Sequence, residues 1–136
     1  MAIDDQRGWI AAAAGSEVWV WSINGFLLVH QSTRSATNDP PSSMTFVARD
    51  FHVDKLGVLV TGHRDCIVMW DIVSNHARAT PPRWRLEKNT VLSLRQSSKA
   101  TCLYMPNTST LCTGHEDGEV YVWTCLLYTS PSPRDL

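Results

Sequence analysis

The stretch Thr110–Trp123, TLCTGHEDGEVYVW, decides the fold of this chain. Two apolar runs flank the turn residues Glu116-Asp117-Gly118, and in the second run valines alternate with aromatic residues. An Asp-Gly pair between two such runs is a strong hairpin signal, because both central residues of the turn must tolerate a positive φ. The stretch therefore predicts two antiparallel strands joined by a tight turn.

The same pattern occurs earlier in the chain, at residues 59–72, as LVTGHRDCIVMWDI. Each copy contains Thr-Gly-His, an Asp three residues after the Gly, and an apolar strand that reaches a Trp. The repeat positions are Thr61, Asp65 and Trp70 in one copy and Thr113, Asp117 and Trp123 in the other. Self-similarity at a regular period is typical of folds built from stacked units.

The rest of the chain also predicts strands. Trp9–Ala14, Glu17–Ile23 and Phe26–Val29 are short apolar runs, and Asn24-Gly25 is a second hairpin turn. No segment has sustained 3.6-residue periodicity, so we expect essentially no helix. Further strands are expected at Met44–Phe51, Val58–Thr61, Trp84–Leu86, Val91–Leu94 and Thr101–Tyr104.

A third tryptophan, Trp21, ends the central strand of the first unit, so Trp21, Trp70 and Trp123 recur at intervals of about 50 residues. We expect all three indoles in the core, because a buried aromatic side chain removes about 150–250 Å² from water. The strands at 18–21 and 67–70 are apolar on both faces. That composition favours sheets stacked face to face.

These residues resemble WD40 repeats, with the family's small residue, turn Asp and terminal Trp in the same order. The resemblance implies an all-β fold: a partial WD40-type β-propeller of about three four-stranded antiparallel blades, the last one incomplete. The blades would lie at approximately 1–30, 44–86 and 91–124, within one unit at 1–124. His63 and His115 lie too close to the Trp to match the family's histidine, so we expect its Thr–Asp–Trp–His tetrad to be at best partial.

A finer resemblance links the chain to the C-terminal propeller of BEACH-domain proteins. It is carried by Trp21–Gly25 followed by Phe26–Val29, by Val60–His63 after a long loop, and by Pro81–Arg85. It implies a protein-interaction scaffold, a fragment of a larger protein acting in membrane trafficking or autophagy. The alternative is another WD40 adaptor, such as a ubiquitin-ligase substrate receptor or a general assembly platform. An enzyme is a third class, which the lack of a catalytic constellation disfavours, so we expect none.

Residues 125–136, CLLYTSPSPRDL, differ in character from the rest. The string resembles one reading frame of a sequencing-library adapter, and we expect a non-native, adapter-derived tail. The alternative is a native Ser/Pro-rich tail. In either case the segment is excluded from the fold prediction.

Composition favours a soluble globular chain: 136 residues, 43% hydrophobic, 18% charged and a net charge of −1. This balance gives no electrostatic case for nucleic acid. No apolar run is long enough to span a membrane, no secretory signal opens the chain, and the four cysteines form no C-x-x-C pair. We therefore expect a cytoplasmic protein with reduced thiols, peripheral to membranes only through its parent protein.

No catalytic, cofactor or metal site is predicted. His63, His115, Cys66 and Cys112 are metal-ligand types, but the two histidines belong to different repeat units and should not converge on one ion. Asp65 and Asp117 are expected to act as turn residues through bonds to local backbone N–H groups.

The predicted partners are other proteins, and the predicted contact is Trp84 with its neighbours Arg83 and Arg85, beside an exposed loop. These arginines belong to a basic group with Lys88, Arg95 and Lys99. A solvated face is the expected role of that group, and a phosphate site is the alternative.

Overall fold

The computed structural model describes residues 1–47, 56–75, 82–107 and 109–124, and these ranges contain eleven β-strands and no helix. The all-β prediction is confirmed. Nothing in the described ranges provides a helix with the length and apolar character needed to cross a membrane. The expected tail at 125–136 lies outside the described residues, as do residues 48–51 of the strand predicted at Met44–Phe51.

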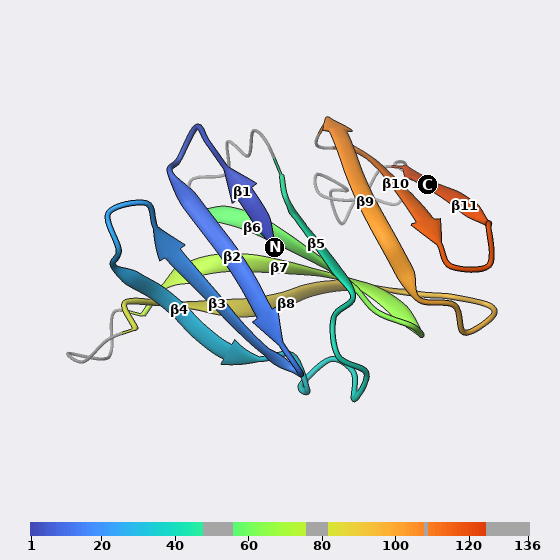
Figure 1. Ribbon diagram of the computed structural model, residues 1–136, viewed down its shortest axis with the longest axis horizontal. Helices are drawn as coiled ribbons and strands as arrows, with labels where there is room; N and C mark the ends of the chain where they lie inside the picture. The colour runs from blue at the N-terminus through green and yellow to red at the C-terminus, as the bar shows by residue number, and fades with distance from the viewer. Residues whose placement is uncertain (48–55, 76–81, 108, 125–136) are drawn as a thin grey trace, which may run out of the picture.

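The strands form three antiparallel sheets (Figure 1). The first sheet contains β1 (Ala2–Asp4), β2 (Trp9–Ala14), β3 (Glu17–Ser22) and β4 (Leu27–Ser32). The middle sheet contains β5 (Ser43–Phe46), β6 (Gly57–Gly62), β7 (Cys66–Ser74) and β8 (Trp84–Ser93). The third sheet contains β9 (Ala100–Asn107), β10 (Thr110–His115) and β11 (Val120–Thr124). Within each sheet, neighbours in space are neighbours in sequence, so every sheet is a simple meander.

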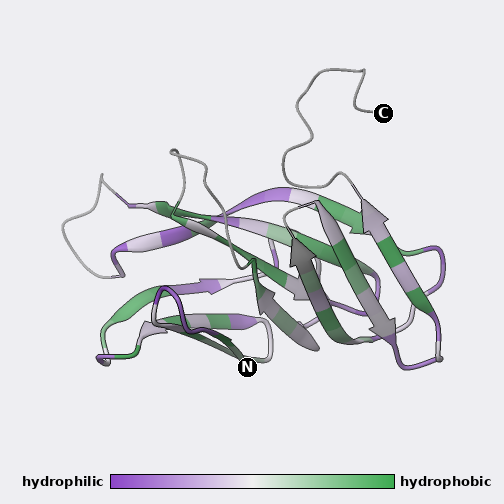
Figure 2. Cartoon of the chain, turned by 90° about the horizontal axis from the view of Figure 1, so that it is seen from above, coloured by the Kyte–Doolittle hydropathy of each residue, from purple (hydrophilic) through white to green (hydrophobic). Residues whose placement is uncertain are grey.

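The sheets stack in the same strand order. The first strands follow one another, because β1 contacts β5 and β5 contacts β9, and the fourth strands β4 and β8 also meet. In Figure 2, apolar residues, drawn in green, recur along the strands of the stacked sheets. The three sheets therefore repeat one strand order, and equivalent strands of neighbouring sheets contact each other.

Two hydrophobic cores fill the spaces between sheets. The core between the first and middle sheets includes Val18, Val20, Leu59, Val68 and Trp70. The core between the middle and third sheets includes Val58, Val60, Ile67, Met69 and Leu111. Alternate residues of β6 and β7 enter opposite cores, which explains why these strands are apolar on both faces.

The hairpin predicted at Thr110–Trp123 is confirmed. β10 and β11 pair antiparallel from Thr110↔Thr124 to Gly114↔Val120. Gly118 has φ of 87°, and its N–H donates to the carbonyl of His115 at 3.0 Å. The Asp117 carboxylate accepts the N–H of Glu119 at 3.0 Å, the local turn contact expected of this residue.

Gly62, the glycine of the first Thr-Gly-His, lies where two sheets approach closely. A Cβ built at this position would come within 2.8 Å of the Cβ of Ala100 in the third sheet, and 2.6 Å from Ser43 Oγ. Real Cβ atoms do not sit this close to other heavy atoms. The missing side chain therefore allows the middle and third sheets to pack at this point.

Polar contacts also tie the sheets together. The Gln31 amide of β4 donates to the Leu86 carbonyl of β8 at 2.8 Å and accepts the Leu86 N–H at 2.9 Å. Ser42 and Ser43 both donate to the carbonyl of Ala100, at 2.6 and 2.8 Å. The buried backbone groups of one sheet are thus satisfied by side chains of another.

Two predicted boundaries are wrong. Trp84–Leu86 and Val91–Leu94 were expected as separate strands, but β8 is continuous from Trp84 to Ser93, so the second unit ends at Ser93 and the third cannot begin at 91. The pairing of β8 with β7 shifts register between Met69↔Thr90 and Trp70↔Lys88, as in a β-bulge. The strand continues through this polar stretch despite the shift. The first sheet also has a fourth strand, β1, which no pattern predicted because it is only three residues long.

Candidate functional site

The two Thr-Gly-His repeats form the same hydrogen-bonded network. In the middle sheet, Trp70 Nε1 donates to Thr61 Oγ1 at 2.8 Å, Thr61 Oγ1 is 2.8 Å from His63 Nε2, and His63 Nδ1 is 2.9 Å from the Asp39 carbonyl. A carbonyl can only accept, so His63 Nδ1 carries the hydrogen and Nε2 accepts from the Thr61 hydroxyl. The chain of bonds from indole to carbonyl is therefore complete.

The third sheet repeats this arrangement with longer bonds at one end. Trp123 Nε1 donates to Thr113 Oγ1 at 3.3 Å, Thr113 Oγ1 is 2.9 Å from His115 Nε2, and His115 Nδ1 is 2.9 Å from the Ser98 carbonyl. The ring of Tyr121 lies edge-on to His115, with 5.0 Å between centroids. His115 is thus held on two sides.

Both networks join a Thr, a Trp and a His, and neither includes the turn aspartate. The Asp65 carboxylate instead accepts the hydroxyl of Thr37, with its two oxygens 2.9 and 2.8 Å away. Besides bonds with its own backbone and with Cys66, Asp65 thus contacts a loop 28 residues away in sequence. From the sequence, His63 and His115 are excluded only as the family's histidine, and these Thr–His bonds are not predicted. The spacing of two residues from Thr to His, which aligns both side chains on one strand face, is the signal that could have indicated the contact.

Burial determines the protonation of this region. It lowers the pKa of His63 below 6.5, although the Asp39 carbonyl and the charge of Asp65 act in the opposite direction. The Cys66 thiol has its pKa raised to about 12, first by burial and then by the nearby Asp65. For Asp65, burial opposes ionisation, but hydrogen bonds from Thr37 and Cys66 outweigh it and lower the pKa. A neutral imidazole and a protonated thiol are structural groups here, since a nucleophilic Cys requires a lowered pKa.

Trp21 does not lie in the core as predicted, since 38% of its surface is exposed. Its strand position matches the other two tryptophans: it pairs with Ile10, as Trp70 pairs with Leu59 and Trp123 with Leu111. Trp70 packs toward the first sheet and Trp123 toward the middle sheet. The equivalent face of the first sheet has no described sheet against it.

The first sheet also lacks the network. Ala12 and Ala14 stand two and four residues after Ile10, at the positions that Thr and His occupy in the other two sheets. Methyl groups cannot accept the indole N–H of Trp21. The alanine run in the sequence is the signal that could have separated Trp21 from its two counterparts.

The predicted partner contact is partly occupied within the protein. Trp84 is half-buried and packs edge-on against Trp9, with ring centroids 5.3 Å apart. The Arg83 guanidinium lies 6.0 Å from the Trp84 ring centroid, while Arg85 donates to the Ser74 carbonyl and pairs with Glu87. Arg83 and Arg85 are exposed and Trp84 is half-buried, and the role of these three residues as a partner contact stays a prediction.

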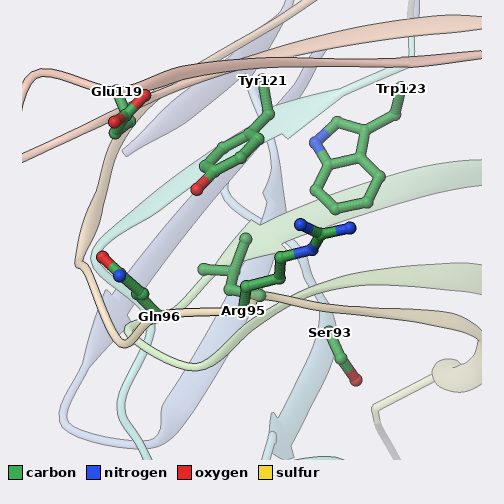
Figure 3. Close-up of a pocket in the computed structure, with 7 residues that line it drawn as sticks. Ser93, Arg95, Gln96, Glu119, Tyr121 and Trp123 are labelled. Carbon is green, nitrogen blue, oxygen red and sulfur yellow. The ribbon is translucent and has the colours of Figure 1, made fainter.

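A cleft of about 500 Å³ lies between the end of β8 and strand β11, and no sequence pattern indicated it. Ser93, Leu94, Arg95 and Gln96 line one side, and Glu119, Tyr121 and Trp123 line the other. Figure 3 shows the Arg95 side chain extending toward the Trp123 indole, with Glu119 and Gln96 at the opposite end and Tyr121 between them. Arg95 was predicted within a basic group, but it is separated from Arg83 and Arg85 by the length of β8.

The cleft offers unused polar groups. In the part of the chain that the structure describes, neither the Arg95 guanidinium nor the Glu119 carboxylate has a salt-bridge partner, in contrast to the nearby Arg64–Glu116 pair at 2.8 Å. Across these same described ranges, no three His, Cys, Asp or Glu side chains cluster so as to hold a metal ion. The arrangement can bind and orient a ligand through charge, hydrogen bonds and ring faces.

Comparison with known proteins identifies no relative: no family model, no curated protein and no solved structure matches the chain. Support for the fold, the Thr–Trp–His networks and the cleft therefore comes from the sequence and the structure alone.

Proposed function

We propose that the chain is part of a WD40-type β-propeller that serves as a protein-interaction scaffold. The observation that carries the proposal is the stacking of three meander sheets in the same order, with first strand against first strand. Meander sheets that stack in sequence order, two of them with the same internal network, are consistent with a radial array of blades.

The scaffold role is supported by the distribution of polar chemistry. The two networks are built into the sheets and hold them in place, while Arg95, Glu119 and Arg83 lie at strand ends and loops. A rigid array that presents variable loops is the common way in which such repeat folds bind partners. The resemblance to BEACH-domain proteins favours a role in membrane trafficking or autophagy, and a WD40 adaptor such as a ubiquitin-ligase substrate receptor is the second candidate.

The test is co-purification of the tagged chain, within its native parent protein, from the source cells. We expect one or more protein partners to elute with it in fixed stoichiometry on size-exclusion chromatography. A parent protein that elutes alone under all conditions would contradict the scaffold role. The transcript upstream of Met1 separates the two candidates, since a BEACH domain there supports the first and an F-box the second.

A further inference from the structure

The cleft between β8 and β11 combines a cation, an anion and two aromatic rings in one space. Its volume of about 500 Å³ falls within the range of roughly 300–1,000 Å³ typical of small-ligand sites, which is room for a few side chains of a peptide. From these groups we infer that the cleft binds an acidic peptide segment of a partner protein, in which a Glu or Asp side chain lies beside an apolar residue. This inference rests on the proposed scaffold function and names the chemistry of one partner contact.

Arg95 provides the carboxylate site. Its guanidinium is exposed, has no salt-bridge partner among the described residues and extends along the cleft toward Trp123 (Figure 3). The planar fork of an arginine matches the two oxygens of a carboxylate, and such charge-assisted pairs are stronger than neutral hydrogen bonds. An incoming carboxylate would therefore find a ready donor at this end.

Trp123 and Tyr121 provide the apolar surface. Both side chains are half-buried on β11, with ring centroids 6.0 Å apart, and Leu94 faces them from the other side. Aromatic rings that are already held in place lose little entropy when a partner side chain packs on them. Trp123 is held by its bond to Thr113, so its ring is positioned in advance.

Glu119 limits the charge of the ligand. It lies at the end of the cleft opposite Arg95 and has no salt-bridge partner among the described residues. A second acidic group or a dianionic phosphate would bring negative charge toward Glu119 against one cation, which is unfavourable. The balance of one arginine and one glutamate therefore favours a single carboxylate followed by neutral residues.

The experiment uses the full 136-residue chain, ¹⁵N-labelled, and follows the indole N–H resonance of Trp123 by NMR. The probes are acetyl-Gly-Glu-Leu-Gly-amide, the same peptide with Gln in place of Glu, and sodium acetate. We expect the Glu peptide to shift the Trp123 resonance saturably and to bind about tenfold more tightly than the Gln peptide, as expected for one charge-assisted hydrogen bond. Acetate should bind more weakly than the Glu peptide.

Three variants test the assignment. Arg95→Gln should weaken binding of the Glu peptide about tenfold, and Glu119→Gln should strengthen it. Arg34→Gln is the matched control, because this exposed arginine follows β4 in the first sheet and does not line the cleft, so it should leave binding unchanged. Because Arg95→Gln should weaken peptide binding and Glu119→Gln should strengthen it, a general loss of folding could not explain both results.

Equal binding of the Glu and Gln peptides, equal binding of acetate, or an equal loss in Arg34→Gln would each overturn the inference. If the peptide test fails while partners still co-purify, the scaffold proposal stands and only the assignment of the cleft as a peptide site is refuted. A parent protein without partners would instead remove the scaffold, even if the peptide binds.

Discussion

The networks of the middle and third sheets are built from the same three residue types, yet they differ in tightness. Trp70 is fully buried and its indole bond to Thr61 is 2.8 Å, whereas Trp123 is half-buried and its bond to Thr113 is 3.3 Å. The middle sheet has a core on each face, while the third sheet has one core and an opposite face that exposes Tyr104, Val120 and Val122.

The difference shows that the repeat motif specifies the contacts and that packing from neighbouring sheets determines how firmly they are held. The first sheet completes the series, since it keeps the tryptophan at position 21 but has alanines in place of Thr and His. Three related units thus contain a buried network, a partly open network and no network. Substitutions in these three units should therefore differ in their cost to stability in the same order.

Replacing the tryptophans should have the largest effect. Trp70→Ala removes a side chain with no exposed surface and should lower the free energy of unfolding by about 3–5 kcal/mol, a large part of the total for a small domain. Trp123→Ala should cost less because part of that indole already contacts solvent, and Trp21→Ala should cost least. Chemical denaturation followed by circular dichroism measures all three. An equal loss in the three variants would refute the gradient.

Removing the central hydroxyl should have a smaller effect. Thr61→Val leaves the Trp70 N–H and the His63 Nε2 without their partner, and each of these neutral groups costs about 1 kcal/mol, at the low end for a buried unpaired group, because Val keeps the shape of the site. Thr113→Val should cost less, since water can reach the half-exposed Trp123. The comparison is made by urea denaturation at neutral pH. A Thr113→Val loss as large as that of Thr61→Val would mean that solvent does not replace the missing hydroxyl.

The pH dependence should have the smallest effect. The pKa of His63 is lowered in the folded chain, so His63 stays neutral there while the unfolded chain takes up a proton near pH 6.5. Stability from this group is therefore fully present above pH 6.5 and is lost as pH falls toward the folded-state pKa. We expect thermal stability to decrease between pH 7 and 5, with a flatter profile in His63→Gln. Parallel profiles for the two chains would contradict this role for His63.

Sequence alone predicted the strands, the turn at Glu116–Gly118 and the repeat, because those depend on local patterns such as Asp-Gly and alternating valines. It failed for Trp21, because burial depends on whether another sheet covers that face. It also missed the His63 and His115 networks, which require two strands to place a threonine, an indole and an imidazole on one side. The Arg95 cleft was unpredictable for the same reason, since its two walls come from different sheets.

The position of the middle sheet between two cores also has a consequence for sequence variation. Nearly every residue of β6 and of the first half of β7 is buried, whereas β11 alternates between exposed and half-buried residues. In a library of single substitutions selected for folding, residues 57–62 and 66–70 should therefore accept the fewest replacements, on either face of the strand. Residues 120–124 should accept polar replacements at every second position. The copy of the repeat in the third sheet should therefore tolerate more substitutions than the copy in the middle sheet.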